Sequence, residues 1–174
     1  MKILVTYSSL SGNTKLLAEA IYAALTSENK TILPIKEASN AENYDVILVG
    51  YWVDKGAPSQ EAAEFLRKLC DKKIGIFATL GYWPDSDHAY EALKKGEDLV
   101  KDSNEVICRN ICQGKLSDQI IEAFKSMPKD HFHALTDEKL RRYEIAARHP
   151  SKADLAVAGE LFEERLQSIC LKKE

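Results

Sequence analysis

Short apolar runs alternate with amphipathic segments along most of the chain. Five of these runs predict strands, near residues 3–5, 31–35, 44–50, 73–80 and 105–112. Their continuous apolar character is typical of parallel strands buried on both faces. The second run contains Pro34, which lacks a backbone donor and therefore favours a position at the edge of a sheet.

Segments with apolar residues three or four positions apart separate the strands and predict helices. These segments cover about residues 14–27, 58–70, 87–101 and 150–170. At the start of the last one, Ser151 and Asp154 have the spacing of a capping box. Strands alternating with helices predict a single α/β domain over residues 1–174 with a doubly wound parallel sheet. Such sheets bind ligands at the carboxyl ends of their strands.

Residues 113–149 form a longer connection than a strand-to-helix link requires. Their pattern predicts two helical pieces, one over 117–126 and one beginning near Thr136, with a break at 128–133. We therefore expect a helical insertion before the C-terminal helix.

Composition narrows the class of protein. The chain has 174 residues, of which 45% are apolar and 29% are charged, as in an ordinary soluble domain. A net charge of −3 argues against a nucleic-acid surface. No apolar run approaches the ~18 residues of a membrane span. Because Met1 and Lys2 lead straight into the first strand, a cleavable signal has no room, and we expect a cytoplasmic protein with reduced cysteines.

Two of the four cysteines, Cys108 and Cys112, lie an even number of residues apart in the last predicted strand. Their side chains should share one face of the sheet. A metal or redox pair would favour a tighter spacing such as C-x-x-C, so we expect buried packing.

A polar loop rich in hydroxyl groups joins the first strand to the first helix. It contains Ser9, Ser11, Gly12, Asn13 and Thr14. The first backbone N–H groups of a helix lack intrahelical partners and lie at the positive end of its dipole, so this loop predicts a phosphate site. A serine-rich turn with an N-cap and no ligand is the alternative, although three hydroxyl groups exceed what one cap needs.

Aromatic pairs follow the third and fourth strands. Tyr51-Trp52 and Tyr82-Trp83 include both tryptophans of the chain. Large aromatic side chains in loops are unfavourable in water unless they cover something, and a flat ring bound between them would fit. The alternative is that they plug the end of the sheet or pack on the extra helices.

Three segments resemble the FMN loops of the flavodoxin family: Ser9-Leu10-Ser11-Gly12-Asn13-Thr14, the run from Gly50 to Gly56, and the run from Thr79 to Asp85. The resemblance covers about the first two-thirds of the chain and implies a five-stranded parallel sheet in the order 2-1-3-4-5. Within the family, the sequence is most similar to a bacterial flavodoxin-like subgroup. This subgroup includes the BilS-type flavoproteins associated with bilirubin reduction.

The resemblance also implies how FMN would be held. The loop side chains and backbone amides would bind the phosphate, Trp52 would stack on one ring face, and Tyr82 or Trp83 would stack on the other. The backbone of residues 54–56 would lie near the flavin N5. The FMN-binding residues implied in this way are Ser9, Leu10, Ser11, Gly12, Asn13, Thr14, Tyr51, Trp52, Val53, Asp54, Lys55, Gly56, Thr79, Leu80, Gly81, Tyr82, Trp83 and Asp85.

Three functional hypotheses follow. The first is an FMN-binding electron carrier that passes electrons from a reductase to an acceptor protein. The alternative is an FMN-dependent NAD(P)H reductase acting on a quinone or a tetrapyrrole such as bilirubin. The third, a receiver-like module without cofactor, is disfavoured because Gly50 and Tyr51 stand where an acidic phosphoacceptor would be needed.

No catalytic side chain is expected, because a flavin carries the redox chemistry itself. His88 could relay a proton but is more typical of a surface residue at a helix start. His131 and His133 have a metal-binding spacing without a third ligand, so we expect no metal site. The basic stretch 139–148 could receive an acidic partner or form a solvated helix face.

Overall fold

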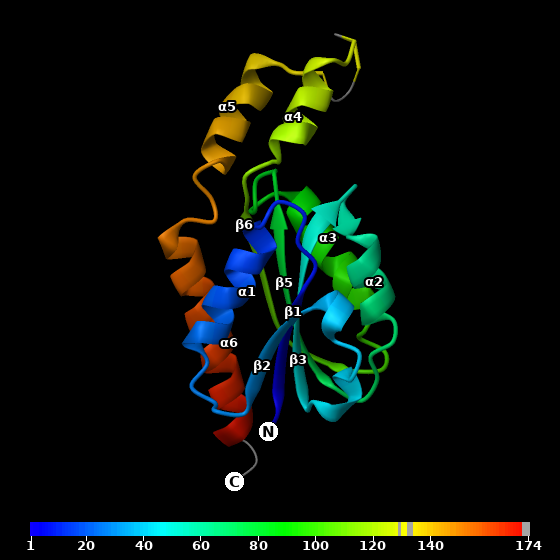
Figure 1. Ribbon diagram of the computed structural model, residues 1–174, viewed down its shortest axis with the longest axis vertical. Coiled ribbons are helices and arrows are strands. Elements are labelled where there is room, and N and C mark those ends of the chain that lie inside the picture. Colours follow the sequence, from blue (N-terminus) through cyan, green and yellow to red (C-terminus); the bar gives the residue numbers. More distant parts are fainter. Residues whose placement is uncertain (129, 132–133, 172–174) are drawn as a thin grey trace.

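The computed structural model describes residues 1–128, 130–131 and 134–171, and its helices cover both faces of a central sheet (Figure 1). The strands are β1 (Ile3–Tyr7), β2 (Lys30–Pro34), β3 (Val46–Asp54), β4 (Ala57–Pro58), β5 (Lys73–Leu80) and β6 (Glu105–Gln113). The α-helices are α1 (Asn13–Ala24), α2 (Gln60–Leu66), α3 (Asp87–Asp98), α4 (Asp118–Lys125), α5 (Asp137–Ala146) and α6 (Lys152–Leu171). Two short 3₁₀ turns, η1 (Ile35–Glu37) and η2 (Ala41–Asn43), follow β2.

The sheet confirms the predicted strand order. Its five parallel strands run β2-β1-β3-β5-β6, which is 2-1-3-4-5 when only the predicted strands are counted. The edge position expected for the strand containing Pro34 is also confirmed, because β2 ends the sheet. All carboxyl ends of these strands therefore lie at one edge, where the three predicted loops begin.

A sixth strand corrects the expectation of a loop over residues 50–56. β3 continues through Asp54 and β4 pairs with it antiparallel, with Asp54 opposite Ala57. Lys55 and Gly56 form the turn between them and have φ angles of 49° and 72°. Positive φ at both central residues is typical of a tight two-residue hairpin. Pro58 consequently lies in β4, and α2 begins at Gln60 rather than at the proline.

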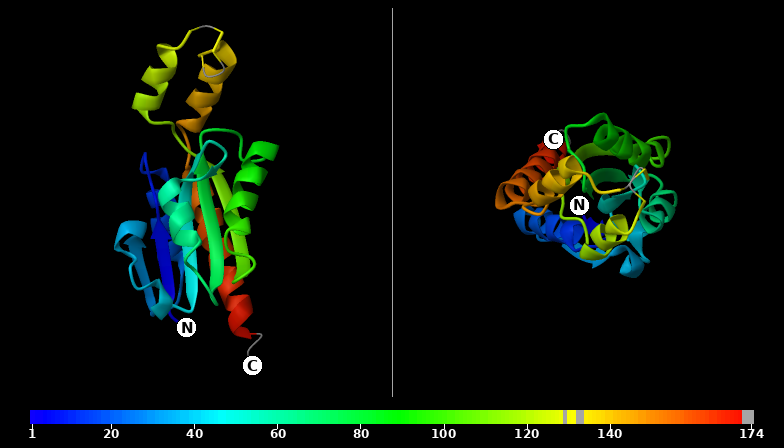
Figure 2. Two further views of the ribbon diagram at one scale, coloured as in Figure 1. Left: turned by 90° about the vertical axis from the view of Figure 1, so that its right-hand side faces the viewer. Right: turned by 90° about the horizontal axis from the view of Figure 1, so that it is seen from above.

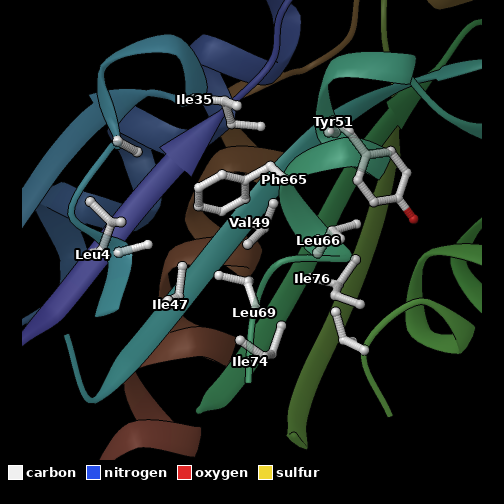
Figure 3. Packing of buried hydrophobic residues seen from close by; sticks show 14 of the residues in the cluster. Leu4, Ile35, Ile47, Val49, Tyr51, Phe65, Leu66, Leu69, Ile74 and Ile76 are labelled. Atoms are coloured by element: carbon white, nitrogen blue, oxygen red, sulfur yellow. The ribbon is translucent and has the colours of Figure 1, made fainter. Parts of the chain in front are cut away.

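Strand alternation divides the core between the two faces of the sheet. On the face covered by α2 and α3, Leu4, Ile47 and Ile76 pack against Phe65 and Leu66 (Figure 3). The other face packs under α1 and α6 and includes, all fully buried or nearly so, Ile3, Val5, Leu17, Ile21, Leu48, Phe77 and Phe162. Each such side chain contributes about 1.5–3 kcal/mol of hydrophobic stabilisation, so both layers hold the sheet firmly.

The cysteines pack as predicted. Cys108 and Cys112 are buried in the same cluster, and all four cysteines are free thiols. Burial raises the pKa of Cys108 to about 11 and that of Cys112 to about 12. These two thiols therefore stay protonated and uncharged at neutral pH.

The insertion between β6 and α6 is helical, as expected. We call α4 and α5 the cap hairpin, because they lie beyond the carboxyl ends of the strands (Figure 1) and over that end of the body (Figure 2). Within the described part of the hairpin, α4 has no buried residue and α5 buries only Ala146. The rings of Phe124 and Tyr143 approach to 6.4 Å between the two helices. The cap hairpin is thus held by far fewer apolar contacts than the body.

The predicted capping box at the start of α6 is confirmed. The backbone N–H of Ser151 donates to Asp154 Oδ2 at 2.6 Å, and the Asp154 N–H donates to Ser151 Oγ at 3.2 Å. The same carboxylate is 2.6 Å from His149 Nδ1. These bonds fix the point where the chain leaves the cap hairpin and enters α6. Among the described residues, no helix combines the length and apolar character needed to cross a membrane.

Candidate functional site

The loop between β1 and α1 has the geometry of an anion site. Gly12 stands at the N-cap of α1 with a φ of 89° and, as a glycine, has no side chain to cap the helix. A Cβ added at Gly12 would meet no atom within 4 Å, so space beside the backbone is open. The first backbone N–H groups of a helix have no intrahelical partner, so these groups and the positive end of the helix dipole favour an anion beside Gly12. A phosphate would supply the missing acceptors.

The serine side chains of this loop lie around the same helix start. Ser9 Oγ accepts a bond from the Lys15 N–H at 3.3 Å, and Ser11 Oγ accepts one from Asn13 Nδ2 at 2.9 Å. Ser9 is half-buried, whereas Leu10 and Ser11 are exposed. Each hydroxyl still has a proton to donate, because in these bonds it only accepts.

Thr14 departs from the picture of an exposed hydroxyl donor. It is buried, and its Oγ1 lies 2.8 Å from Oγ1 of Thr79 at the end of β5. The pair ties the start of α1 to the loop after β5, so two of the three predicted loops are joined directly. Both hydroxyl groups are satisfied within the protein, which makes their role structural in this arrangement.

A second buried pair ties the loop to the β3–β4 hairpin. Ser59 Oγ donates to Ser8 Oγ at 3.1 Å, and the Ser8 N–H donates to the Gly50 carbonyl at 2.9 Å. Sequence reasoning did not single out Ser59, which lies just beyond the hairpin. Its position immediately before a helix is the only signal that could have marked it.

Tyr51 is a correction to the predicted pair of aromatic loops. It lies within β3, its side chain is fully buried under α3, and its hydroxyl donates to the Ala92 carbonyl at 3.1 Å (Figure 3). Burial raises the pKa of this phenol. Successive strand residues point to opposite faces, so Trp52 faces away from that core and is half-buried. Only the backbone of Tyr51 remains for a ligand.

The tip of the hairpin is supported by α3. Lys95 Nζ donates to the Gly56 carbonyl at 2.9 Å, and a Cβ at Gly56 would lie 3.1 Å from Cε1 of His88. Val53 and Asp54 are half-buried and Lys55 is exposed. Sequence reasoning missed Lys95. It lies seven residues after His88, so the two share one helix face, and this spacing could have revealed the pair.

The loop after β5 presents one exposed ring. Tyr82 is 38% exposed and meets His88 edge to face, with ring centres 5.7 Å apart. Trp83 is half-buried, and its carbonyl accepts a bond from Ser86 Oγ at 2.6 Å. The same serine caps α3, which fixes the loop. Leu80 is buried, Gly81 is half-buried and Asp85 is exposed.

The base of the insertion also contacts these loops. Asn13 Nδ2 donates to the Lys115 carbonyl at 2.8 Å, and the Gly114 N–H donates to the Leu80 carbonyl at 2.8 Å. A Cβ at Gly81 would clash with Leu116. From α5, the guanidinium carbon of Arg142 lies 4.5 Å from the centre of the Tyr82 ring. The insertion therefore adjoins the same edge of the sheet as the three loops.

The structure thus brings all three predicted loops to one edge of the sheet, although binding of FMN to their residues stays a prediction. No group of three His, Cys, Asp or Glu side chains within the described residues could hold a metal ion. The predicted metal spacing involved His131 and His133, and His133 lies outside the described residues. His88 is exposed at the start of α3, as expected.

A groove of about 660 Å³ lies elsewhere, between the 3₁₀ turns after β2 and the helix α2. Its lining carries both signs of charge, with Glu61, Glu64 and Lys68 among the side chains. Its lining includes no tyrosine or tryptophan, and the first turn of α2 carries the acidic Glu61 there. The chemistry of an anion and a flat ring therefore points to the loop cluster and not to this groove.

Comparisons with known proteins show the family of the chain. Residues 4–163 match the flavodoxin domain family. A flavodoxin-like domain-containing protein, BilS, from Clostridioides difficile (strain CD3) is 34% identical over 166 residues, covering 91% of this chain and 93% of the relative. BilS from Clostridium symbiosum (strain WAL-14163) is 24% identical and covers 90% of this chain and 91% of its own length.

Solved flavodoxins share the fold. A flavodoxin from the domain Archaea has a TM-score of 0.58 at 16% identity, covering 97% of this chain and 99% of that one. Fusobacterium nucleatum flavodoxin bound to flavin mononucleotide has a TM-score of 0.58 at 11% identity, covering 98% of both chains. At these identities the likeness concerns the fold alone.

Proposed function

Because the chain belongs to the flavodoxin domain family, we propose that it binds FMN at the loop cluster and carries electrons from a reductase to an acceptor protein. The observation that carries the proposal is the start of α1, where the N-cap residue Gly12 has a positive φ and lies beside open space. The same edge of the sheet holds the ring side chains of Trp52 and Tyr82, so an anion site and aromatic surfaces adjoin.

The residues present suit both ends of FMN. Its phosphate would accept bonds from the first backbone N–H groups of α1 and from the hydroxyl groups of Ser9 and Ser11. Trp52 would cover one face of the isoalloxazine, and Tyr82 or Trp83 would cover the other. When bound, FMN supplies one- and two-electron redox chemistry.

The remaining residues of the site position these groups. Through buried hydroxyl pairs, Ser8 ties the phosphate loop to Ser59 at the start of α2, and Thr14 ties it to β5. Lys95 holds the Gly56 carbonyl, which fixes the tip of the β3–β4 hairpin. A site whose loops are held in advance loses little conformational freedom when the cofactor binds.

The absorption spectrum of the purified protein tests the proposal. We expect a flavin spectrum after purification, or its appearance with saturation at one FMN per chain when FMN is added to colourless protein. Protein that binds no FMN under titration would contradict the proposal. Riboflavin serves as a matched probe, because it lacks the phosphate and should bind far more weakly.

A second candidate function is direct reduction of a quinone or a tetrapyrrole such as bilirubin with NAD(P)H. The cap hairpin favours it, because α5 reaches Tyr82 at the proposed ring site, where a small acceptor could bind. Oxidation of NAD(P)H by the FMN-loaded protein alone, at catalytic rates, would support this candidate. Turnover that requires an added reductase would support the carrier.

A further inference from the structure

Arg142 connects the cap hairpin to the proposed cofactor site. Its guanidinium carbon lies 4.5 Å from the centre of the Tyr82 ring and 5.5 Å from that of Tyr143. Tyr82 belongs to the loop after β5, and Tyr143 is the next residue on α5. The cation therefore lies against two aromatic rings, one from the body and one from the insertion, in an arrangement favourable for cation–π attraction.

The hydrogen-bonding capacity of Arg142 is not used within the described part of the chain. Its Nε atom is buried there without a hydrogen-bond partner, and none of the ion pairs found among those residues includes its guanidinium. A guanidinium is permanently charged and presents five N–H donors in one plane. Burying such a donor is unfavourable unless an acceptor reaches it. The Arg142 guanidinium thus has unused donors with which it could bind an anionic ligand.

We propose that Arg142 binds a carboxylate group of a small aromatic electron acceptor at the junction of the cap hairpin and the loop after β5. The Tyr82 ring lies 4.5 Å from the guanidinium carbon, and the two terminal nitrogens could form a bidentate bond to a planar carboxylate. The neighbouring rings favour an aromatic body for the ligand. The inference rests on the proposed FMN site and deepens the second candidate function, because it names the chemistry of the acceptor.

The burial of Arg142 favours a small molecule over the acidic surface of a protein. Arg142 is half-buried, whereas Arg141 and Arg148 are exposed. An acidic protein surface would meet the two exposed arginines first. A carboxylate on a narrow molecule can reach the inner one beside Tyr82.

Two adjacent arginines provide a matched pair of variants. Arg142→Gln removes the inner guanidinium, and Arg141→Gln removes the same charge one residue away on the exposed side of α5. A general electrostatic effect would weaken anion binding similarly in both, whereas a specific site would respond only to the first. Arg142→Lys keeps the charge but loses the planar fork, so it should bind with intermediate affinity.

Equilibrium dialysis of oxidised, FMN-loaded protein tests the inference without any turnover. The probes are anthraquinone-2-carboxylate and its uncharged carboxamide, which share a ring system and differ in the acidic group. We expect the wild type to bind the carboxylate at least tenfold more tightly than the carboxamide. Arg142→Gln should lose this preference, and Arg141→Gln should keep it.

Equal affinity for the two probes, failure to bind either, or equal loss in both variants would overturn the inference. Comparison of the two probes on the wild type alone already tests it if Arg142→Gln does not fold. The FMN content of each sample is read from its absorption before dialysis. A sample that takes up no FMN would contradict the proposed function itself, and this outcome is distinguishable from the loss of carboxylate preference.

Discussion

The sheet body and the cap hairpin differ in how they are stabilised. In the body, most residues of strands β1, β3 and β5 are buried, and helices pack on both faces. In the described part of the cap hairpin, α4 has no buried residue and Ala146 is the single buried residue of α5. The body therefore has the properties of a rigid scaffold, whereas the hairpin is free to serve ligand binding, since segments with few buried contacts open at low cost.

The largest expected effect concerns the core of the body. Phe162 is fully buried and meets Phe77 edge to face at 5.9 Å, so Phe162→Ala should lower the free energy of unfolding by about 3–5 kcal/mol. Leu140 in α5 is 40% exposed, and Leu140→Ala should change the free energy of unfolding by less than about 1 kcal/mol. Urea denaturation measures both. Similar losses in the two variants would contradict the contrast between body and cap hairpin.

The next effect concerns FMN affinity at the junction of loop and helix. Replacing Ser9 and Ser11 together by alanine should weaken the binding of FMN by about 1.5–3 kcal/mol for each hydroxyl that donates to the phosphate. The change would be read from FMN titration followed by flavin fluorescence. Ser126→Ala in the cap hairpin is the matched control, because its hydroxyl bonds to the Ala123 carbonyl away from the loop cluster. Unchanged affinity in the double variant would contradict the phosphate assignment.

The buried pair of Thr14 and Thr79 gives a sharper test of how the loops are tied. Thr14→Val or Thr79→Val leaves one buried hydroxyl without its partner, which should cost about 1–3 kcal/mol of unfolding free energy. The double valine variant removes both polar groups and should recover part of this loss. Thermal unfolding of the four proteins completes the double-mutant cycle. Additive losses would show that the pair is not coupled.

The smallest effect is pH-dependent and lies where the cap hairpin joins α6. Burial alone would raise the pKa of Asp154, but hydrogen bonds from Ser151 and His149 together lower it below the ordinary value of 3.8. A lowered folded pKa contributes stability above the unfolded pKa, and this contribution is lost as the pH falls through the folded one. Asp154→Asn should therefore lower the free energy of unfolding by about 1 kcal/mol at pH 7, which is typical of a lost cap. The loss should become progressively smaller below about pH 4.

Thermal unfolding of Asp154→Asn at pH 7 and pH 3 measures this dependence. Asp118→Asn is the control, because the Asp118 side chain is 82% exposed and pairs with Lys115 at the surface. A loss of stability in Asp154→Asn that is the same at both pH values would contradict the assignment.

Much of the fold could be predicted because its signals are local. Runs of buried apolar residues located the five parallel strands, and Ser151 with Asp154 located the start of α6. The β3–β4 hairpin was missed because lysine is not typical of a tight turn with positive φ. The left-handed backbone of Lys55 is imposed by pairing between Asp54 and Ala57. Tyr51 was misplaced for the same reason, since the extended strand turns its ring into the core.

The candidate site also combines features that local sequence predicts with features that it does not. Ser9, Ser11 and Gly12 could be predicted from the sequence as an anion site, because such a site at a helix start depends on neighbouring residues. The contacts made by Lys95, Ser59 and Arg142 could not be predicted from the sequence, because each contact joins segments far apart in the chain.

The sequence by itself determined the alternation of strands and helices, the hydroxyl-rich loop before α1 and the presence of an insertion, since these depend on periodicity and neighbouring side chains. Only the tertiary structure decided which of two adjacent tyrosine and tryptophan side chains stays available at β3, and which of two adjacent arginines reaches Tyr82. The physical reason is that packing directs one of two neighbouring side chains inward and leaves the next one accessible, and this choice depends on segments far away in the chain.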